Sequence, residues 1–189
     1  MEPIEVLQNL GVLRTGHFKL TSGRHSDKYM QCAKLFEHPA ESADLCARLA
    51  GAFKGGGGTA DVVAGPAVGG IIMAYEVARA IGVRCVFTER ENGVMTLRRG
   101  FSVSPGERVL VVEDVVTTGG SVKEVIELLR GAGAEIAGVA SIVDRSGGKV
   151  DFGVKFRSLV SMDIKSWDAE TCPLCREGIP TAKPGSRKE

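Results

Sequence analysis

An apolar run that leads directly into a glycine-rich loop and then a helical repeat is the feature that most constrains this chain. Residues 108–130 read RVLVVEDVVTTGGSVKEVIELLR. The run VLVV is apolar at consecutive positions, which is typical of a strand buried on both faces of a parallel sheet. After the loop, apolar residues recur at helical spacing. The segment therefore predicts a strand, a tight loop and a helix in a protein of the α/β class.

The same alternation of apolar runs and helical segments recurs along the chain. We expect strands at residues 61–65, 84–89, 108–114, 135–144 and 155–162, and helices at residues 3–13, 38–53, 69–82 and 121–133. Strands that alternate with helices are typical of a central, mostly parallel sheet flanked by helices. The run KGGGGT at residues 54–59 is expected to be a flexible connector before a strand.

Length and composition narrow the class of protein. With 189 residues, 43% of them hydrophobic, the chain is long enough for one well-buried domain, which we expect to span residues 1–189. Lys and Arg number 24 and Asp and Glu 23, so the net charge of +1 provides no basic field for nucleic acid. The sequence contains no apolar run of roughly 18 residues and no signal-peptide pattern, and its five scattered cysteines fit reduced thiols. We therefore expect a cytoplasmic protein with a small-molecule partner and no nucleic-acid or membrane partner.

The loop TTGGS at residues 117–121 has the composition of an anion-binding site. Glycines allow a tight turn, and successive backbone N–H groups and the start of the next helix then converge on the anion. Glu113 and Asp114 directly precede this loop, where carboxylates can accept hydrogen bonds from sugar hydroxyls near a divalent cation. Neither a Walker A loop nor a dinucleotide fingerprint is present. The combination indicates a phosphorylated sugar, whereas a simple polar turn would leave the two adjacent acids unexplained.

The segment VLVVEDVVTTGGS resembles the phosphoribosyl diphosphate signature of the type I phosphoribosyltransferases. FKLTSGRHSDKY, AGPAVGGI, VDRSGG and CPLCREGIPTAKPGSR are similar to the orotate branch of that family, and the resemblance covers nearly the whole chain. It implies transfer of a 5-phosphoribosyl group from phosphoribosyl diphosphate to orotate, which gives orotidine 5′-monophosphate and diphosphate in de novo pyrimidine (UMP) biosynthesis. It also implies Mg²⁺, a homodimer, and a small hood formed mainly by residues 1–38 and 162–189.

The resemblance further implies roles for individual residues. Glu113 and Asp114 would engage the ribose hydroxyls, and Asp114 would be catalytic. The donor would be bound by Glu113, Asp114, Val115, Val116, Thr117, Thr118, Gly119, Gly120 and Ser121, the last five around its 5′-phosphate. The orotate-binding residues would be Thr117, Arg145, Tyr29 and Met30. The guanidinium of Arg145 suits a planar anion. No direct protein ligand is expected for Mg²⁺, which substrate and water would mainly hold.

One departure from the family pattern lies in GPAVGG, the loop that would receive diphosphate through its backbone N–H groups. Better-known members carry a tyrosine and a lysine where this chain has Val68 and Gly69. A cationic contact to diphosphate is therefore missing from this loop.

A second departure lies in TERENGVMTLRRGF at residues 88–101, where the family has a mobile cationic lid. This span lacks lysine and histidine but retains Arg90, Arg98 and Arg99. We expect these arginines to be catalytic by meeting the leaving diphosphate, over the site of the neighbouring subunit. The alternative is a solvated hairpin whose arginines only maintain solubility.

Two other functions remain open on the sequence. A purine phosphoribosyltransferase would use the same donor site, but Arg145 within VDRSGG and the segment SGRHSDKY match the orotate branch. A non-catalytic sensor of phosphoribosyl diphosphate that regulates gene expression would explain the missing lysines. The lack of a basic nucleic-acid-binding extension weakens that alternative.

The histidines and the cysteine pair have simple interpretations. His17, His25 and His38 show no metal-ligand spacing, and we expect surface or capping residues, with His25 the one worth testing. Cys172 and Cys175 form a lone C-x-x-C, which supplies only two of the usual four zinc ligands. We expect a reduced or incidental pair, with zinc the less favoured alternative.

Overall fold

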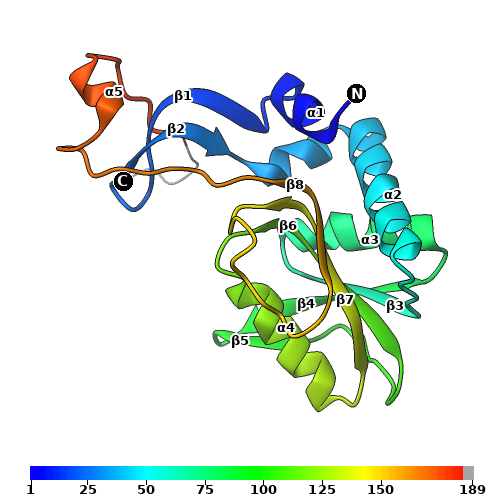
Figure 1. Cartoon of the computed structure of the whole chain (residues 1–189). Helices are drawn as coiled ribbons and strands as arrows, with labels where there is room; N and C mark the ends of the chain where they lie inside the picture. The colour runs from blue at the N-terminus through cyan, green and yellow to red at the C-terminus, as the bar shows by residue number, and fades with distance from the viewer. Residues whose placement is uncertain (185–189) are drawn as a thin grey trace.

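The structure is a computed structural model that describes residues 1–184; residues 185–189, the end of the predicted hood, lie outside the described residues. A six-stranded sheet forms its centre (Figure 1). The strands are β3 (Val62–Pro66), β4 (Arg84–Glu91), β5 (Val94–Leu97), β6 (Arg108–Val116), β7 (Glu135–Asp144) and β8 (Phe156–Ser161), in the spatial order β5-β4-β3-β6-β7-β8. All neighbours are parallel except β4 and β5. The predicted α/β class and mostly parallel sheet are confirmed.

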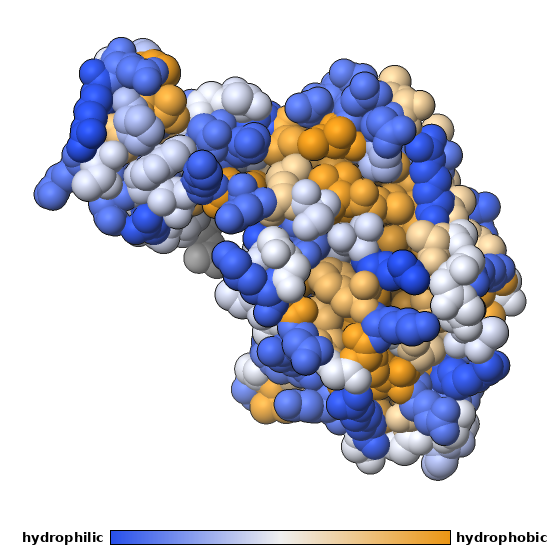
Figure 2. All heavy atoms as spheres, viewed as in Figure 1, coloured by the Kyte–Doolittle hydropathy of each residue, from blue (hydrophilic) through white to orange (hydrophobic). Residues whose placement is uncertain are grey.

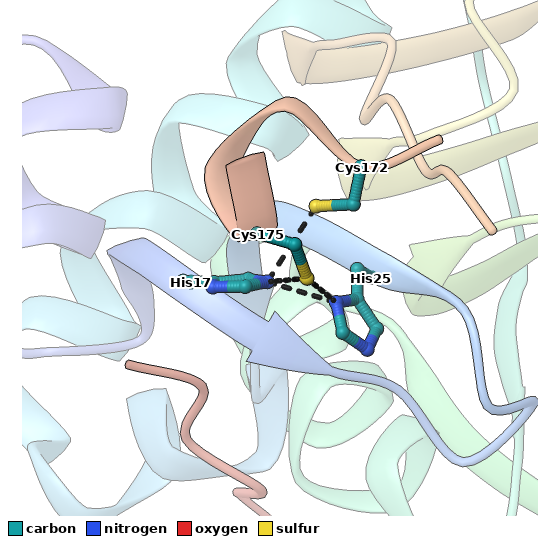
Figure 3. Close-up of side chains that lie close together, drawn as sticks. All are labelled: His17, His25, Cys172 and Cys175. Carbon is teal, nitrogen blue, oxygen red and sulfur yellow. Dashed lines mark hydrogen bonds between the residues drawn. The ribbon is translucent and has the colours of Figure 1, made fainter. Parts of the chain in front are cut away.

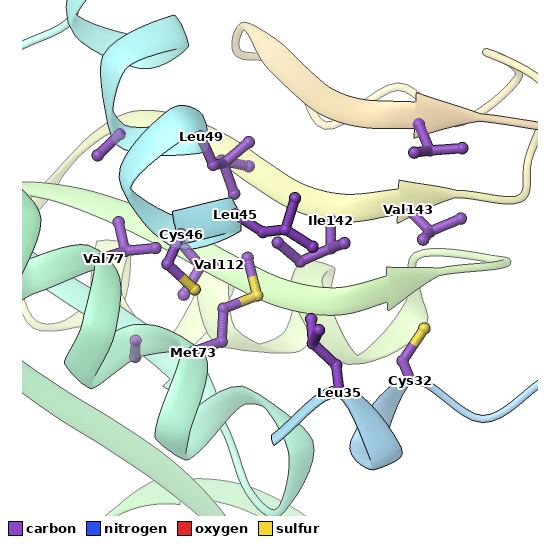
Figure 4. Close-up of a cluster of buried hydrophobic side chains, with 14 of the residues drawn as sticks. Cys32, Leu35, Leu45, Cys46, Leu49, Met73, Val77, Val112, Ile142 and Val143 are labelled. Atoms are coloured by element: carbon purple, nitrogen blue, oxygen red, sulfur yellow. The ribbon is translucent and has the colours of Figure 1, made fainter. Parts of the chain in front are cut away.

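Helices cover both faces of this sheet and bury two apolar clusters. On one face, α2 (Pro39–Gly55) and α3 (Gly69–Ile81) pack through residues such as Leu45, Leu49 and Met73 against Val112 and Ile142 of the sheet (Figure 4). On the other face, α4 (Gly120–Gly131) buries its own apolar residues against β3, β6 and β7. Burial on both faces is why these strands are continuous apolar runs. No helix within residues 1–184 is long and apolar enough to cross a membrane.

The N-terminal part of the chain differs from the sequence-based prediction. The helix expected over residues 3–13 is α1 (Pro3–Asn9), which ends early because Gly11 adopts a left-handed conformation, with φ of 65°. A hairpin of β1 (Leu13–Lys19) and β2 (His25–Met30) follows, and then a 3₁₀ helix, η1 (Cys32–Glu37). The hairpin was not predicted, because its strands are mostly polar and lack a clear alternating apolar face.

The C-terminal segment returns to this hairpin and pairs with it. His25 and Trp167 exchange two backbone N–H···O bonds of 2.8 and 2.9 Å. The N–H of Lys19 donates to the carbonyl of Ala182 at 2.9 Å, and the N–H of Ala182 donates to the carbonyl of His17 at 2.8 Å. The short helix α5 (Pro173–Arg176) lies beside β1 and β2, away from the central sheet (Figure 1). We call β1, β2 and residues 165–182 the terminal lobe.

The expectation that His17 and His25 are surface residues is wrong. Their exposed fractions are 4% and 6%, because the C-terminal segment covers the hairpin at this point. Both rings face Cys172 and Cys175 inside the terminal lobe. His38 lies at the N-cap position of α2, but its side chain makes no capping hydrogen bond.

Candidate active site

The order of the strands makes a topological switch point between β3 and β6, and we call the space outside their carboxyl ends the crevice. From β3 the chain crosses through α3 to β4 on one side, whereas from β6 it crosses through α4 to β7 on the other side. Ligands of open α/β sheets bind at such a switch point, outside the carboxyl ends of the strands. The two loops that leave β3 and β6 here are GPAVGG and TTGGS. Both were predicted from sequence to bind the donor, and the fold brings them together.

The glycine-rich loop after β6 has the backbone that its sequence predicts. Gly119, which precedes α4, has φ of 75°, a conformation that L side chains rarely adopt. A Cβ at this position would lie 2.7 Å from Cγ1 of Val150 and 2.9 Å from the ring of Phe152. Glycine is therefore required both for the turn and for the close approach of the neighbouring segment. The turn directs the N-terminus of α4 toward the crevice, where it favours an anion.

The loop after β3 depends on small residues for its position. A Cβ on Gly65 would lie 2.5 Å from the carbonyl oxygen of Gly70, so α3 could not pack this closely with a side chain there. A Cβ on Gly69 would lie 2.7 Å from Oδ2 of Asp114. Glycine at this position thus lets the start of α3 lie against the carboxylate at the end of β6. The peptide bond between Ala67 and Val68 is cis.

Glu113 and Asp114 form a poorly solvated carboxyl pair in the crevice. Burial, followed by the charge of Asp114, raises the pKa of Glu113 to about 8. Burial also raises the pKa of Asp114, although the backbone N–H of Val115, which donates to its Oδ1 at 2.8 Å, acts in the opposite direction. The raised pKa values therefore favour retention of a proton on the pair when no ligand is bound. Donors or cations that satisfy the carboxylates would release it.

Arg145 lies beside the same loop, at the end of β7. Val116 and Asp144 are register partners, and the backbone N–H of Arg145 donates to the carbonyl of Val116 at 2.8 Å. Asp144 accepts backbone N–H bonds from Ser146 at 2.7 Å and Gly148 at 3.1 Å, which shapes the loop that follows. The Nε of Arg145 is buried without a hydrogen-bond partner among the described residues. A buried donor without a partner is costly, so an anionic ligand is its natural acceptor.

Cys32 is a residue of this region that the sequence did not single out. Burial raises the pKa of its thiol well above the ordinary value of 9.0, and the next largest effects come from Asp114, Arg145 and Glu113. The 3₁₀ helix η1, which carries Cys32, packs against β6 and α3. An isolated cysteine in a short apolar segment carries no signal that would have identified this position. The thiol is too buried and too weakly acidic to act as a nucleophile.

Tyr29 and Met30 end strand β2, at the side of the hairpin that joins η1. Met30 is buried in the apolar cluster beneath α2 and α3. Tyr29 is partly exposed, its ring centroid is 5.7 Å from that of Phe18, and its hydroxyl donates to Gln31 at 3.0 Å. Consecutive strand residues point to opposite faces. The two side chains therefore face different surroundings.

The predicted lid forms a β-hairpin from β4 and β5 in this structure. Its turn contains Asn92 and Gly93 with φ of 52° and 84°, and Asn-Gly is the strongest short-range hairpin signal. That dipeptide could have identified β5 from sequence. The N–H of Ala67 donates to the carbonyl of Thr88 at 2.7 Å, so the hairpin starts beside the GPAVGG loop.

Each of the three lid arginines has an acidic partner in this hairpin conformation. The closest N···O distances are 2.6 Å for Arg90 and Glu124, 3.3 Å for Arg98 and Glu91, and 2.7 Å for Arg99 and Glu89. The arginines are 45–62% exposed at their side chains. Exposed ion pairs of this kind contribute little stability, so they can exchange their partners for a stronger anion.

Comparison with known proteins defines the class first. Residues 33–172 match the phosphoribosyl transferase domain family. The match includes the crevice loops, the carboxyl pair and Arg145. The chain belongs to the phosphoribosyltransferase family.

Individual relatives then define the branch. An orotate phosphoribosyltransferase of Caldanaerobacter subterraneus subsp. tengcongensis is 63% identical over 185 residues, which cover 98% of this chain and 96% of the relative. One of Thermotoga maritima is 58% identical over 183 residues, with 97% of each chain covered. Within its family, the chain is therefore an orotate phosphoribosyltransferase, as the sequence motifs predicted.

Solved structures agree with this assignment. The crystal structure of orotate phosphoribosyltransferase from Aeropyrum pernix is 27% identical, with a TM-score of 0.68 over 84% of this chain and 92% of that chain. An adenine phosphoribosyltransferase from Thermoanaerobacter pseudethanolicus has a TM-score of 0.62 at 18% identity, over 71% of this chain and 88% of that chain. The second similarity establishes only the shared fold.

Proposed function

We propose that the crevice between β3 and β6 is where this chain performs its orotate phosphoribosyltransferase activity in pyrimidine biosynthesis. One observation carries the proposal: a glycine-rich loop, a carboxyl pair and an arginine whose buried Nε has no partner among the described residues meet at the switch point of the sheet. A sugar phosphate needs the loop, its hydroxyls need the carboxyls, and an anionic base needs the arginine. The substrates would be phosphoribosyl diphosphate and orotate.

The donor would lie along the loop after β6. Residues 117–121 would surround the 5′-phosphate with backbone N–H groups at the start of α4. Glu113 and Asp114 would accept hydrogen bonds from the ribose hydroxyls. Val115 and Val116 would contribute through the strand backbone that leads into the loop. Because the pKa values of the carboxyl pair are raised, donor binding at neutral pH is expected to release a proton.

Breaking the C1′–O bond leaves positive charge on the ribose and negative charge on diphosphate. Buried carboxyl oxygens beside the crevice fit the oxygen-rich, hydrated shell that Mg²⁺ prefers, with no direct protein ligand required. Mg²⁺ would neutralise the leaving diphosphate. Asp114 would face the positive charge that develops on the ribose. Arg90, Arg98 and Arg99 would exchange their glutamate partners for diphosphate when the hairpin closes.

Orotate would bind between the loop after β6 and the terminal lobe. Arg145, beside Thr117, would pair with the planar anion through its guanidinium group. Tyr29 would pack on the base from β2, and Met30 would support that position from the core below it. Since N1 of orotate loses its proton readily, the transfer needs no strong general base. The terminal lobe would then belong to the hood predicted for residues 1–38 and 162–189, and the lobe would close over the base.

A homodimer is proposed because α3 leaves large apolar side chains exposed. Val68, Ile72 and Tyr75 have exposed fractions of 83%, 48% and 61%. A second copy of the chain would cover this surface and bring one lid hairpin over the neighbouring site. Five free cysteines support the predicted cytoplasmic location. Light scattering coupled to size exclusion would measure the oligomeric state, and a monomer at micromolar concentration would contradict the proposed homodimer.

Diphosphate release tests the proposed substrates. Purified protein with Mg²⁺ and phosphoribosyl diphosphate is expected to release diphosphate rapidly with orotate, but not with uracil, adenine, hypoxanthine or guanine. Activity with a purine and none with orotate would support the alternative purine enzyme. No activity with any base would favour the non-catalytic sensor.

A matched pair of variants ties that activity to the crevice. Asp114→Asn is expected to weaken donor binding or turnover while the fold is retained. Asp151→Asn changes an exposed loop aspartate and serves as its control. Equal kinetics for the two variants would remove Asp114 from the site.

A further inference from the structure

His17, His25, Cys172 and Cys175 form a compact group inside the terminal lobe (Figure 3). Their ligand atoms, two ring nitrogens and two sulfurs, all lie within 4.8 Å of one another. The histidines come from adjacent strands of the hairpin, and the cysteines flank the start of α5. None of the four belongs to the proposed crevice.

Three nitrogen–sulfur distances in the group are close to those of a tetrahedral zinc site. Zn–S bonds of about 2.3 Å and Zn–N bonds of about 2.0–2.1 Å imply roughly 3.6 Å between N and S and 3.3 Å between the nitrogens. The Nε2 of His17 lies 3.5 Å from Sγ of Cys172 and 3.7 Å from Sγ of Cys175. The Nδ1 of His25 lies 3.2 Å from Sγ of Cys175. At 2.8 Å the two nitrogens are closer than a shared ion needs, so the rings would separate by about half an ångström.

The outer hydrogen bond of His17 prepares its inner nitrogen to bind a metal. Its Nδ1 lies 2.7 Å from the carbonyl oxygen of Ile179, which can only accept a hydrogen bond. The proton therefore resides on Nδ1, and the lone pair of Nε2 points into the group. A ligating histidine commonly makes this bond from its other nitrogen to a backbone carbonyl, which fixes the ring and its tautomer.

Apart from its hydrogen bonds, the terminal lobe has little apolar burial with which to hold the C-terminal segment in place. Leu13 and Met30, at the ends of the hairpin strands, join the cluster beneath α2 and α3, whereas the buried apolar side chains Phe18 and Cys172 belong to neither cluster around the sheet. Figure 2 shows that the surface of this projecting part is largely hydrophilic, whereas apolar side chains gather on the main body. The Arg24–Asp168 ion pair is exposed and contributes little. A small unit with so little apolar burial commonly depends on a metal or a disulfide.

We propose that His17, His25, Cys172 and Cys175 bind one Zn²⁺ in a closed structural site that fastens the C-terminal segment to the hairpin. Two thiolates and two imidazoles in a tetrahedral arrangement are a typical zinc ligand set. Four protein ligands leave no position for water, so the ion stabilises the lobe and does not take part in the transfer. Because β2 continues from His25 to Tyr29, the ion also supports the base side of the proposed crevice.

The zinc content of protein purified without an affinity tag tests the proposal directly. Wild-type protein is expected to contain about one Zn²⁺ per chain by elemental analysis, and Cys175→Ser together with His25→Gln to contain about tenfold less. Cys85→Ser and His38→Gln, which alter a cysteine and a histidine outside the group, are expected to retain it. Wild-type protein with almost no zinc, or variants that keep the full amount, would overturn the proposal.

A spectroscopic measurement keeps the test independent of how well the variants fold. Wild-type protein exchanged with Co²⁺ is expected to show thiolate-to-cobalt charge transfer and the intense visible bands of a tetrahedral site. A chelator is expected to lower the melting temperature of wild type but not that of Cys175→Ser. An octahedral cobalt spectrum would overturn the proposal. So would a disulfide between Cys172 and Cys175, detected as resistance of both thiols to alkylation before reduction.

Discussion

The carboxyl pair at the end of β6 predicts a specific dependence of folding stability on pH. The pKa of Glu113 rises from 4.5 to about 8 on folding, because burial and the neighbouring Asp114 disfavour its ionised form. Between these two pH values the folded protein keeps a proton that the unfolded chain has released. The free energy of unfolding is therefore highest, as far as Glu113 affects it, below pH 4.5. It falls as the pH rises toward about 8.

Replacing Glu113 with glutamine removes this loss. The pKa difference between 4.5 and about 8, at roughly 1.4 kcal/mol per pH unit, sets an upper limit of about 5 kcal/mol on the folding stability that Glu113 removes. Because Glu113 is partly exposed, solvent screening reduces this, and we expect about 2–3 kcal/mol. Glu113→Gln should thus match wild type near pH 4.5 and become progressively more stable than wild type up to about pH 8, at the expense of donor binding.

Denaturant unfolding from pH 4.5 to 9 at a fixed protein concentration measures this difference. Fixing the concentration matters because the proposed homodimer would be stabilised by mass action. Glu127→Gln, which removes an exposed carboxyl on α4, controls for the loss of one acidic residue. A free-energy difference between Glu113→Gln and wild type that stays constant over this range would refute the reasoning. So would a variant that becomes less stable than wild type as the pH rises.

Two further predictions concern the proposed substrate contacts. Arg145→Ala should weaken orotate binding by roughly ten- to a hundredfold and change phosphoribosyl diphosphate binding much less, because the buried Nε has no protein partner to lose. The KM values for both substrates, compared with those of Arg130→Ala, test this prediction. An equal loss for both substrates would indicate a structural role for Arg145. Arg98→Ala combined with Arg99→Ala should lower turnover by roughly ten- to a thousandfold with only a small change in melting temperature, since both side chains are largely exposed. Steady-state kinetics beside thermal melting would check it, and unchanged turnover would mean that the loop is only a solvated hairpin.

The sequence alone predicted the features that depend on neighbours along the chain. The apolar runs of β3, β6 and β7 and the helical repeats between them are local patterns, and they were sufficient for the α/β class. The loop proposed to bind the donor was also recognisable, because its glycines, threonines and preceding acids lie within one short segment. The resemblance of that segment to a known signature extended the prediction to the family.

Where the local pattern was weak or irregular, the sequence did not predict the helices and strands correctly. The β1–β2 hairpin is mostly polar, because the C-terminal segment and not the main core covers it, so its strands lack a strong apolar alternation. Helix α1 ended before its predicted limit at Gly11, where a single backbone conformation outweighed the apolar spacing. The strand β5 was signalled by Asn92 and Gly93, but the arginines beside them suggested a mobile lid.

The tertiary structure decided which distant residues meet. His17 and Cys172 are separated by 155 positions, and their spacing along the chain resembles no metal motif, yet the return of the C-terminal segment places them 3.5 Å apart. For Arg145, which the resemblance had already named as an orotate-binding residue, the structure added that its Nε is buried without a hydrogen-bond partner among the described residues. Short-range patterns determine elements and loops because they act between neighbouring residues, whereas burial and ligand geometry arise only when the folded chain brings separate segments together.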